Sequence, residues 1–181
     1  MRLFIAIELE GEARDFVLGM RQKMVESITR QGVRFVKPEK LHLTIAFLGD
    51  VDEDELGPLA VALGTVNGSA FEIAFQAIGG FPDLRRPKVV WIGLNRGEPE
   101  LEKLSEAVKP IVKLFAPQMD DKPFSAHLTV ARVSPGSKEV GAILSRLPET
   151  GESPPMVVDH ISLVHSKRDG TYETIAKIGL R

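Results

Sequence analysis

The sequence contains no cysteine in its 181 residues. That absence excludes disulfides, thiol nucleophiles and cysteine-ligated zinc, and it suits a reducing compartment. A long apolar run is also missing, because no stretch approaches the ~20 apolar residues that a membrane helix requires. Residues 1–8 become acidic too early for a signal peptide and predict a strand instead. We therefore expect a cytoplasmic protein without a membrane partner.

The chain also lacks an excess of charge of either sign. Its 23 Lys and Arg nearly balance 25 Asp and Glu, which leaves a formal net charge of −2. A protein that coats long nucleic acids nonspecifically is usually basic, so any phosphate recognised here must be held by a few local groups. Hydrophobic residues make up 43% of the chain, and no Gly/Ser-rich linker divides it. We predict one bilobal domain over residues 1–181.

Histidine is scarce, with 4 in the chain, yet two of the four have nearly identical neighbours. His42 begins the segment His-Leu-Thr-Ile-Ala, and His127 begins His-Leu-Thr-Val-Ala. A lone histidine on an apolar strand is usually a satisfied core residue, and a duplicated structural strand is the alternative here. An internal repeat that keeps both polar positions instead predicts two related half-structures, each giving a histidine and a threonine to one site.

Side chains at i and i+2 of a strand project from the same face. By this alternation Phe47 is expected on the core-facing side of its strand. Alanine beyond each threonine would leave room for a ligand. The residues expected together on the ligand side are His42, Thr44 and Ala46 in the first strand and His127, Thr129 and Ala131 in the second.

The order of the predicted elements points to a fold class. Helical apolar spacing recurs over 10–31, from Asp52 or Asp54 to Leu63, over 98–115 and over 138–147. Strands are predicted over 2–9, 34–36, 41–48, 70–78, 88–94, 125–133, 156–164 and 171–178, with a break at 79–82 and a hairpin turn at 167–170. A doubly wound parallel sheet would alternate more strictly. We predict an α+β, bilobal fold in which two mostly antiparallel sheets face each other across a central cleft, with helices outside and a pseudo-two-fold repeat.

Two histidines and two hydroxyls suit phosphoester cleavage by general acid–base catalysis. Unperturbed histidine titrates near ~6.5, so one ring can be neutral while the other is charged. The neutral ring would take a proton from water and the charged ring would give one to the departing oxygen, each contributing ~10²–10⁴-fold. The hydroxyls can donate to phosphate oxygens. Zinc needs three or four ligands and the motifs offer two, so we expect no metal and no cofactor; a metal site is the alternative.

These motifs resemble those of the 2H phosphoesterase superfamily, named for paired His-x-Thr-x motifs. The resemblance is closer still to the RNA 2′,3′-cyclic phosphodiesterases, also called 2′-5′ RNA ligase-like proteins, and it covers nearly the whole chain. Its blocks are residues 2–7, 41–49, 80–93 and 127–132. The resemblance implies hydrolysis of a 2′,3′-cyclic phosphate at an RNA end, tRNA-like fragments included, to a 2′-phosphomonoester, with 2′-5′ ligation as the reverse sense.

The resemblance also implies roles for single residues. His42 would protonate the leaving 3′-oxygen, and His127 would accept a proton from water. Arg132 would contact phosphate, although strict alternation turns it toward the core unless a bulge or the strand's end re-aims it. Phe47 could stack on a base or belong to the core. Thr44 and Thr129 complete the set of substrate-binding residues.

Other interpretations stay open at this point. One is a phosphodiesterase for a small cyclic nucleotide, such as an ADP-ribose cyclic phosphate. Another is a noncatalytic module that binds RNA ends. Trp91 is expected in the core, and His160 and His165 are expected to be structural. Basic residues that could line the rim for an RNA strand, or be solvated surface, are Arg30, Arg34, Lys37, Lys40, Arg85, Arg86 and Lys88.

Overall fold

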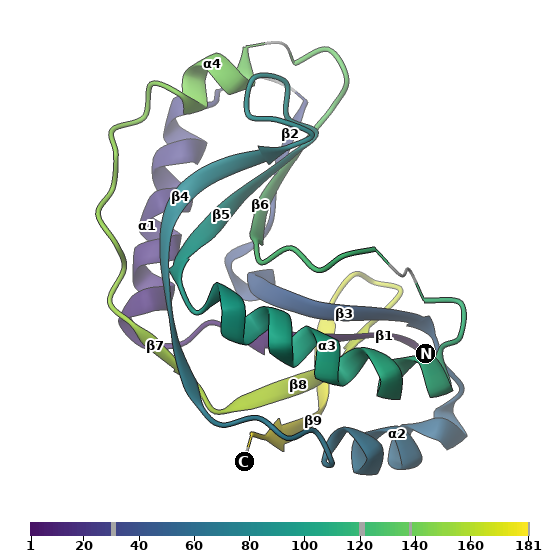
Figure 1. The fold of residues 1–181 in the computed structure, drawn as a ribbon. Helices are drawn as coiled ribbons and strands as arrows, with labels where there is room; N and C mark the ends of the chain where they lie inside the picture. Colours follow the sequence, from purple (N-terminus) through teal and green to yellow (C-terminus); the bar gives the residue numbers. More distant parts are fainter. Residues whose placement is uncertain (30–31, 120–121, 138, 181) are drawn as a thin grey trace.

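Two antiparallel sheets dominate the computed structural model, which describes residues 1–29, 32–119, 122–137 and 139–180 (Figure 1). Sheet A has the order β3-β1-β8-β9, with β3 at His42–Asp50, β1 at Arg2–Glu8, β8 at His160–Ser166 and β9 at Tyr172–Gly179. Sheet B has the order β2-β6-β5-β4-β7, with β2 at Val33–Phe35, β6 at Leu128–Val133, β5 at Val89–Arg96, β4 at Phe71–Phe81 and β7 at Met156–Val158. The predicted α+β class with antiparallel sheets is confirmed.

Helices pack on the faces of these sheets. Helix α1 (Gly11–Ser27) contacts β4 and β7 of sheet B, and α3 (Glu98–Phe115) contacts β3 of sheet A (Figure 1). Helix α2 (Leu56–Leu63) packs against α3 and β9, while α4 (Val140–Leu144) is short. No helix in the described part of the chain combines the length and hydrophobicity needed to cross a bilayer.

The two halves of the chain repeat one succession of elements and exchange strands. The first half runs β1, α1, β3, α2, β4, and the second runs β5, α3, β6, α4, β8, with β2, β7 and β9 as additions. In sheet A, β1 lies between β3 and β8, and in sheet B, β5 lies between β6 and β4. Each sheet therefore contains strands from both halves, in keeping with the predicted pseudo-two-fold repeat.

Helix α3 shows how the sequence specifies this packing. Gly97, at φ 86°, precedes the helix, and Pro99 lies in its first turn, where a missing N–H has no consequence. Leu101, Leu104 and Val108 are buried along one stripe, and burying each such side chain is worth ~1.5–3 kcal/mol. The helix is thereby fixed on the core side of β3.

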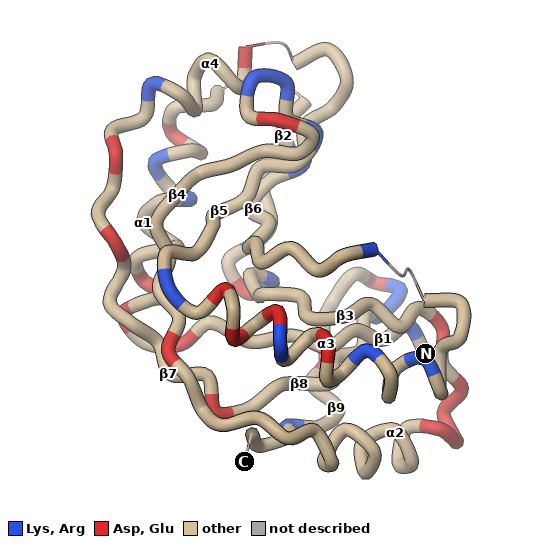
Figure 2. Tube along the Cα trace, in the orientation of Figure 1, with Lys and Arg blue, Asp and Glu red and all other residues tan. Residues whose placement is uncertain are grey.

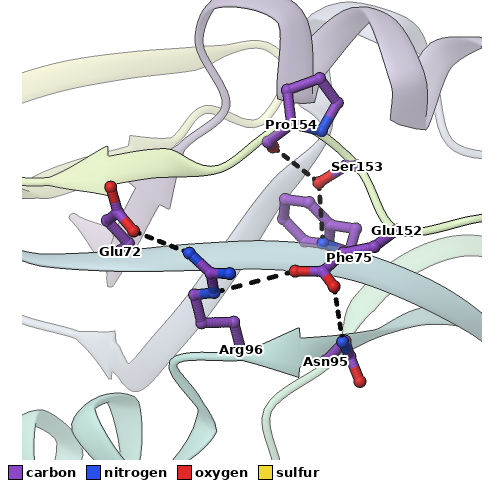
Figure 3. A network of polar contacts seen from close by, with 7 residues as sticks. All are labelled: Glu72, Phe75, Asn95, Arg96, Glu152, Ser153 and Pro154. Carbon is purple, nitrogen blue, oxygen red and sulfur yellow. Dashed lines mark hydrogen bonds and ion pairs between the residues drawn. The ribbon is translucent and has the colours of Figure 1, made fainter.

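The segment before β7 is fastened to sheet B by polar contacts (Figure 3). The Phe75 backbone N–H donates to the Ser153 hydroxyl at 2.9 Å, and the Asn95 amide donates to Glu152 at 2.7 Å. Arg96 donates to Glu72 at 2.8 Å and lies 3.8 Å from Glu152. The segment therefore reaches β7 along a defined path.

Several predicted boundaries differ from the structure. Helix α1 ends at Ser27, before the predicted end at Gln31, which lies outside the described residues, as does Lys138 at the start of the fourth predicted helix. The predicted strand over 156–164 is two strands, since β7 pairs with β4 and β8 pairs with β1. Strand β4 continues through the predicted break at 79–82 as far as Phe81, with Gly79 leaving room for the Trp91 indole and Gly80 for the Pro87 ring.

Candidate functional site

Strand β3 contains a β-bulge inside the first motif. Ile5 pairs with Ala46 and Ala6 pairs with Thr44, so Ile45 is the extra residue. A bulge shifts the alternation of side chains by one position. Ile45 and Ala46 are both buried, whereas Phe47 is 64% exposed. The predictions that Ala46 faces the ligand side and Phe47 the core are therefore wrong.

Strand β6 contains the same irregularity at the same place in the second motif. Val90 pairs with Ala131 and Trp91 pairs with Thr129, which leaves Val130 as the extra residue. Ala131 is buried rather than beside the ligand, and Arg132 is exposed. Simple alternation would turn Arg132 toward the core, and the bulge reverses this so that Arg132 points away from it. In both motifs, the first, third and sixth residues share the outward face.

A hydrogen bond fixes the orientation of the His42 ring. Its Nδ1 lies 2.7 Å from the carbonyl oxygen of Lys40, which can only accept, so Nδ1 carries the hydrogen. Nε2 is therefore the atom that gains and loses the titrating proton. It lies 3.0 Å from Oγ1 of Thr44, and in the neutral ring it accepts from that hydroxyl.

The His127 ring is held in the same way. Its Nδ1 lies 2.7 Å from the carbonyl oxygen of Ser125, again two residues earlier, so Nδ1 carries a hydrogen and Nε2 is left for other partners. The Phe81 ring meets it edge-on at 4.9 Å, and the Trp91 ring lies at 6.4 Å. Among the described residues, no hydrogen bond joins His127 to Thr129, in contrast to the first motif.

The surroundings of His42 are aromatic and largely closed to water. Phe4 stacks on its ring at 4.8 Å with 30° between the planes, and Tyr172 meets it edge-on at 5.5 Å. Burial lowers the pKa of His42, although its bond to the Lys40 carbonyl and the nearby Glu8 carboxylate act in the opposite direction. The free protein therefore favours the neutral form of this ring.

A cavity of about 250 Å³ opens beside His42. Its lining combines apolar side chains with charged and aromatic groups. Its lining includes Phe4, Ala6, Glu8, Lys40, His42 and Tyr172. A larger cavity, of about 390 Å³, is lined by Met1, Asp50 and Leu114 among others. Neither motif histidine lines it, so we do not assign the catalytic site to this cavity.

The two motif strands contact each other where the sheets approach (Figure 1). No ring contact between described residues joins the aromatic group around His42 to the one around His127, and neither cavity is lined by both rings. The structure thus gives each ring a matched orientation, and the convergence of both rings on one phosphorus atom stays a prediction.

Trp91 belongs to the face of His127 rather than to the core, contrary to expectation. It pairs with Thr129, and its ring lies 5.4 Å from that of Phe81. A Cβ at Gly79 would come within 2.1 Å of the indole, and one at Gly93 within 2.9 Å. The indole Nε1 is buried without a partner among the described residues. Glycines on the strand beside a tryptophan were the sequence signal for this arrangement.

Comparison with known proteins identifies the family. An RNA 2′,3′-cyclic phosphodiesterase of Archaeoglobus fulgidus is 38% identical over 146 residues, covering 81% of this chain and 80% of its own. Its counterpart in Methanothermobacter thermautotrophicus is 35% identical over 171 residues, covering 92% and 90%. The family model described as LigT like phosphoesterase matches residues 7–91, which include the first motif. The chain belongs to the LigT-like phosphoesterase family.

Two solved structures share the fold. TT0787 of Thermus thermophilus superposes with a TM-score of 0.77 at 28% identity, covering 100% of this chain and 98% of that one. E. coli LigT complexed with 3′-AMP gives a TM-score of 0.78 at 24% identity, with coverage of 99% and 97%. The shared fold therefore covers nearly the whole chain.

The other two histidines of this LigT-like phosphoesterase lie outside the motif strands. His160 Nδ1 lies 2.6 Å from Asp159, and that hydrogen bond lowers the pKa of the Asp159 carboxyl. Glu8, Glu10 and His160 offer ligand atoms within 4.8 Å of one another. The Lys177 ammonium lies 3.5 Å from Glu8 and 3.9 Å from Glu10, so a fixed cation already balances these carboxylates.

Proposed function

We propose that this chain is an RNA 2′,3′-cyclic phosphodiesterase that opens the cyclic phosphate at an RNA end to a 2′-phosphomonoester. The observation that carries the proposal is the matched pair of imidazoles. In each motif Nδ1 is bonded at 2.7 Å to the carbonyl two residues earlier, which leaves Nε2 for proton transfer. The activity for which the relatives in Archaeoglobus fulgidus and Methanothermobacter thermautotrophicus are named supports the same substrate.

The proposed reaction needs one proton acceptor and one donor. His127 Nε2 takes a proton from water as its oxygen bonds to phosphorus, and the bond from phosphorus to the 3′-oxygen breaks. His42 Nε2–H gives its proton to that oxygen, so the products are a 2′-phosphomonoester and a free 3′-hydroxyl. Proton exchange with solvent restores both rings.

The lowered pKa of His42 opposes its charged form before substrate binds. A cyclic phosphodiester carries a negative charge, and an anion near an imidazole raises its pKa. Binding of substrate beside Thr44 would therefore supply the charge that makes His42 a donor. The donor role is thus coupled to occupancy of the site.

The remaining predicted residues have supporting roles in this proposal. Thr44 and Thr129 donate to the nonbridging phosphate oxygens, on which negative charge grows during attack. Arg132 pairs with the phosphate, since its bulged strand turns it outward. Phe47, exposed on the same face as Thr44, offers a surface on which a base can stack.

The test uses an oligoribonucleotide ending in a 2′,3′-cyclic phosphate, with EDTA present throughout. We expect turnover that survives chelation and falls ~10²–10⁴-fold in His42→Ala and again in His127→Ala. Circular dichroism controls for folding of both variants. Turnover lost on chelation, or retained in both variants, would contradict the proposal.

The same experiment separates the other interpretations. A phosphodiesterase for a small cyclic nucleotide would turn over the mononucleotide far faster than the oligonucleotide. A noncatalytic RNA-end module would show no turnover, while both alanine variants would keep their affinity. Ligation in the reverse sense would use the same groups with their roles exchanged, and it would give a 2′-5′ linkage from two RNA ends.

A further inference from the structure

Two arginines face each other across neighbouring strands of sheet B. Arg34 of β2 is the register partner of Arg132 of β6. Directly paired residues of antiparallel strands project from the same face. Both side chains are exposed. Both arginine side chains therefore leave the sheet from the same face, at adjacent positions.

The adjacent residue shows which surface this is. The Arg21 guanidinium of α1 lies 5.7 Å above the ring of Phe35, and its Nε donates to the Val36 carbonyl at 2.7 Å. Phe35 therefore faces α1, and alternation places Arg34 on the opposite face of the sheet. That opposite face is the one to which the bulge turns Thr129 and Arg132.

No residue in the described part of the chain neutralises this pair of cations. Like charges placed opposite each other in a sheet are destabilising. Neither guanidinium forms an ion pair or hydrogen bond with any residue that the structure describes. The loop between β4 and β5 contains both positive and negative residues (Figure 2), namely Arg85, Arg86 and Asp83, while Arg30, predicted for the same rim, lies outside the described residues. In a chain with a net charge of −2, the paired positive charges of Arg34 and Arg132 are complementary to an anion.

We propose that Arg34, the neighbour of the Arg132 that holds the cyclic phosphate, binds a second phosphate of the RNA strand, the one on the 5′ side of the terminal nucleoside. This inference rests on the proposed function. Guanidinium forks match phosphate oxygens in a bidentate geometry. Arg132 is three residues from Thr129, no more than ~10 Å along the strand, and Arg34 is one strand spacing of ~4.8 Å further. Strand β2 is an edge of sheet B, so this path leads out to solvent.

The subsite would distinguish an RNA end from a lone nucleotide. A cyclic mononucleotide without a 5′-phosphate has no second phosphate to place against Arg34. A strand, or a nucleotide with a 5′-phosphate, gains a charge-assisted contact there. Arg34 is in this account a specificity residue and has no part in the proton transfers.

The test measures equilibrium binding, so that it does not depend on turnover. Calorimetry compares adenosine 3′,5′-bisphosphate with adenosine 3′-monophosphate on the whole chain. We expect the bisphosphate to bind about tenfold tighter, a factor that corresponds to one modest charged contact. In Arg34→Ala that ratio falls toward one, and binding of the bisphosphate becomes less sensitive to salt, because one charged contact is lost.

Two further variants sharpen the result. Lys23→Ala removes the same charge from the solvent side of α1, on the far face of sheet B, and should keep the full ratio. Arg34→Lys keeps the charge without the fork and should keep part of it. Equal affinities in the wild type, no binding of the bisphosphate, or a ratio unchanged in Arg34→Ala would overturn the subsite. Loss of cyclic phosphodiester turnover with the ratio intact would instead count against the proposed function alone.

Discussion

At the scale of single residues, the pKa of His42 decides when its ring can donate a proton. Burial lowers this pKa, and the Glu8 carboxylate raises it. Glu8 is the register partner of His42 on the neighbouring strand. A carboxylate in that position stabilises the imidazolium, so it favours the donor form that the proposed reaction needs.

Replacement of Glu8 tests this coupling. Glu8→Gln removes a negative charge, and we therefore expect the pKa of His42 to fall further. At neutral pH fewer molecules would carry the donor proton, so kcat/KM should drop and the deficit should shrink as the pH is lowered. NMR titration of the His42 ring measures the shift directly.

The matched control for this variant is Glu10→Gln. It removes the same charge from the other carboxylate near Lys177, which is not among the groups that move the pKa of His42. An unchanged His42 titration in Glu8→Gln, or an equal fall in both variants, would show that the Glu8 charge does not tune this ring.

At the scale of elements, the two bulges determine which side chains reach the site. Simple alternation predicted the face on which the histidines and threonines lie, because these residues precede the extra residue of each bulge. Alternation failed for Ala46 and Phe47 and could not decide the face of Arg132, because these three residues follow the extra residue of their strand. A bulge is set by the register of the partner strand, and that register depends on contacts with distant residues.

A pair of neighbouring substitutions tests the first bulge. Ile45 is buried as the extra residue, so Ile45→Ala should lower the free energy of unfolding by ~2–5 kcal/mol. Phe47 is 64% exposed, so Phe47→Ala should change it by no more than ~0.5 kcal/mol. Urea denaturation measures both changes.

The same pair should separate stability from binding. Loss of a stacked base costs ~1–3 kcal/mol, so Phe47→Ala should weaken RNA binding roughly 5- to 100-fold. If Phe47→Ala destabilised the fold as much as Ile45→Ala, the alternation beyond the bulge would not be shifted as described.

At the scale of the whole molecule, the internal repeat is visible in the sequence, but the exchange of strands between the two sheets is not. The shared neighbours of His42 and His127 by themselves indicate two related halves. The exchange of β4 and β8 between the sheets depends on pairing between remote strands, which local spacing does not encode. The orientation of each ring likewise depends on backbone carbonyls, and the placement of Trp91 depends on glycines of a neighbouring strand.

The central claim is that both halves of the chain bring an imidazole to one phosphorus atom. The most direct measurement is an NMR titration with inorganic phosphate, following the ring signals of His42 and His127. We predict that both signals shift along one binding curve with a single Kd, because one anion lies against both rings. Two curves with different Kd values, or a shift of only one ring, would contradict the account.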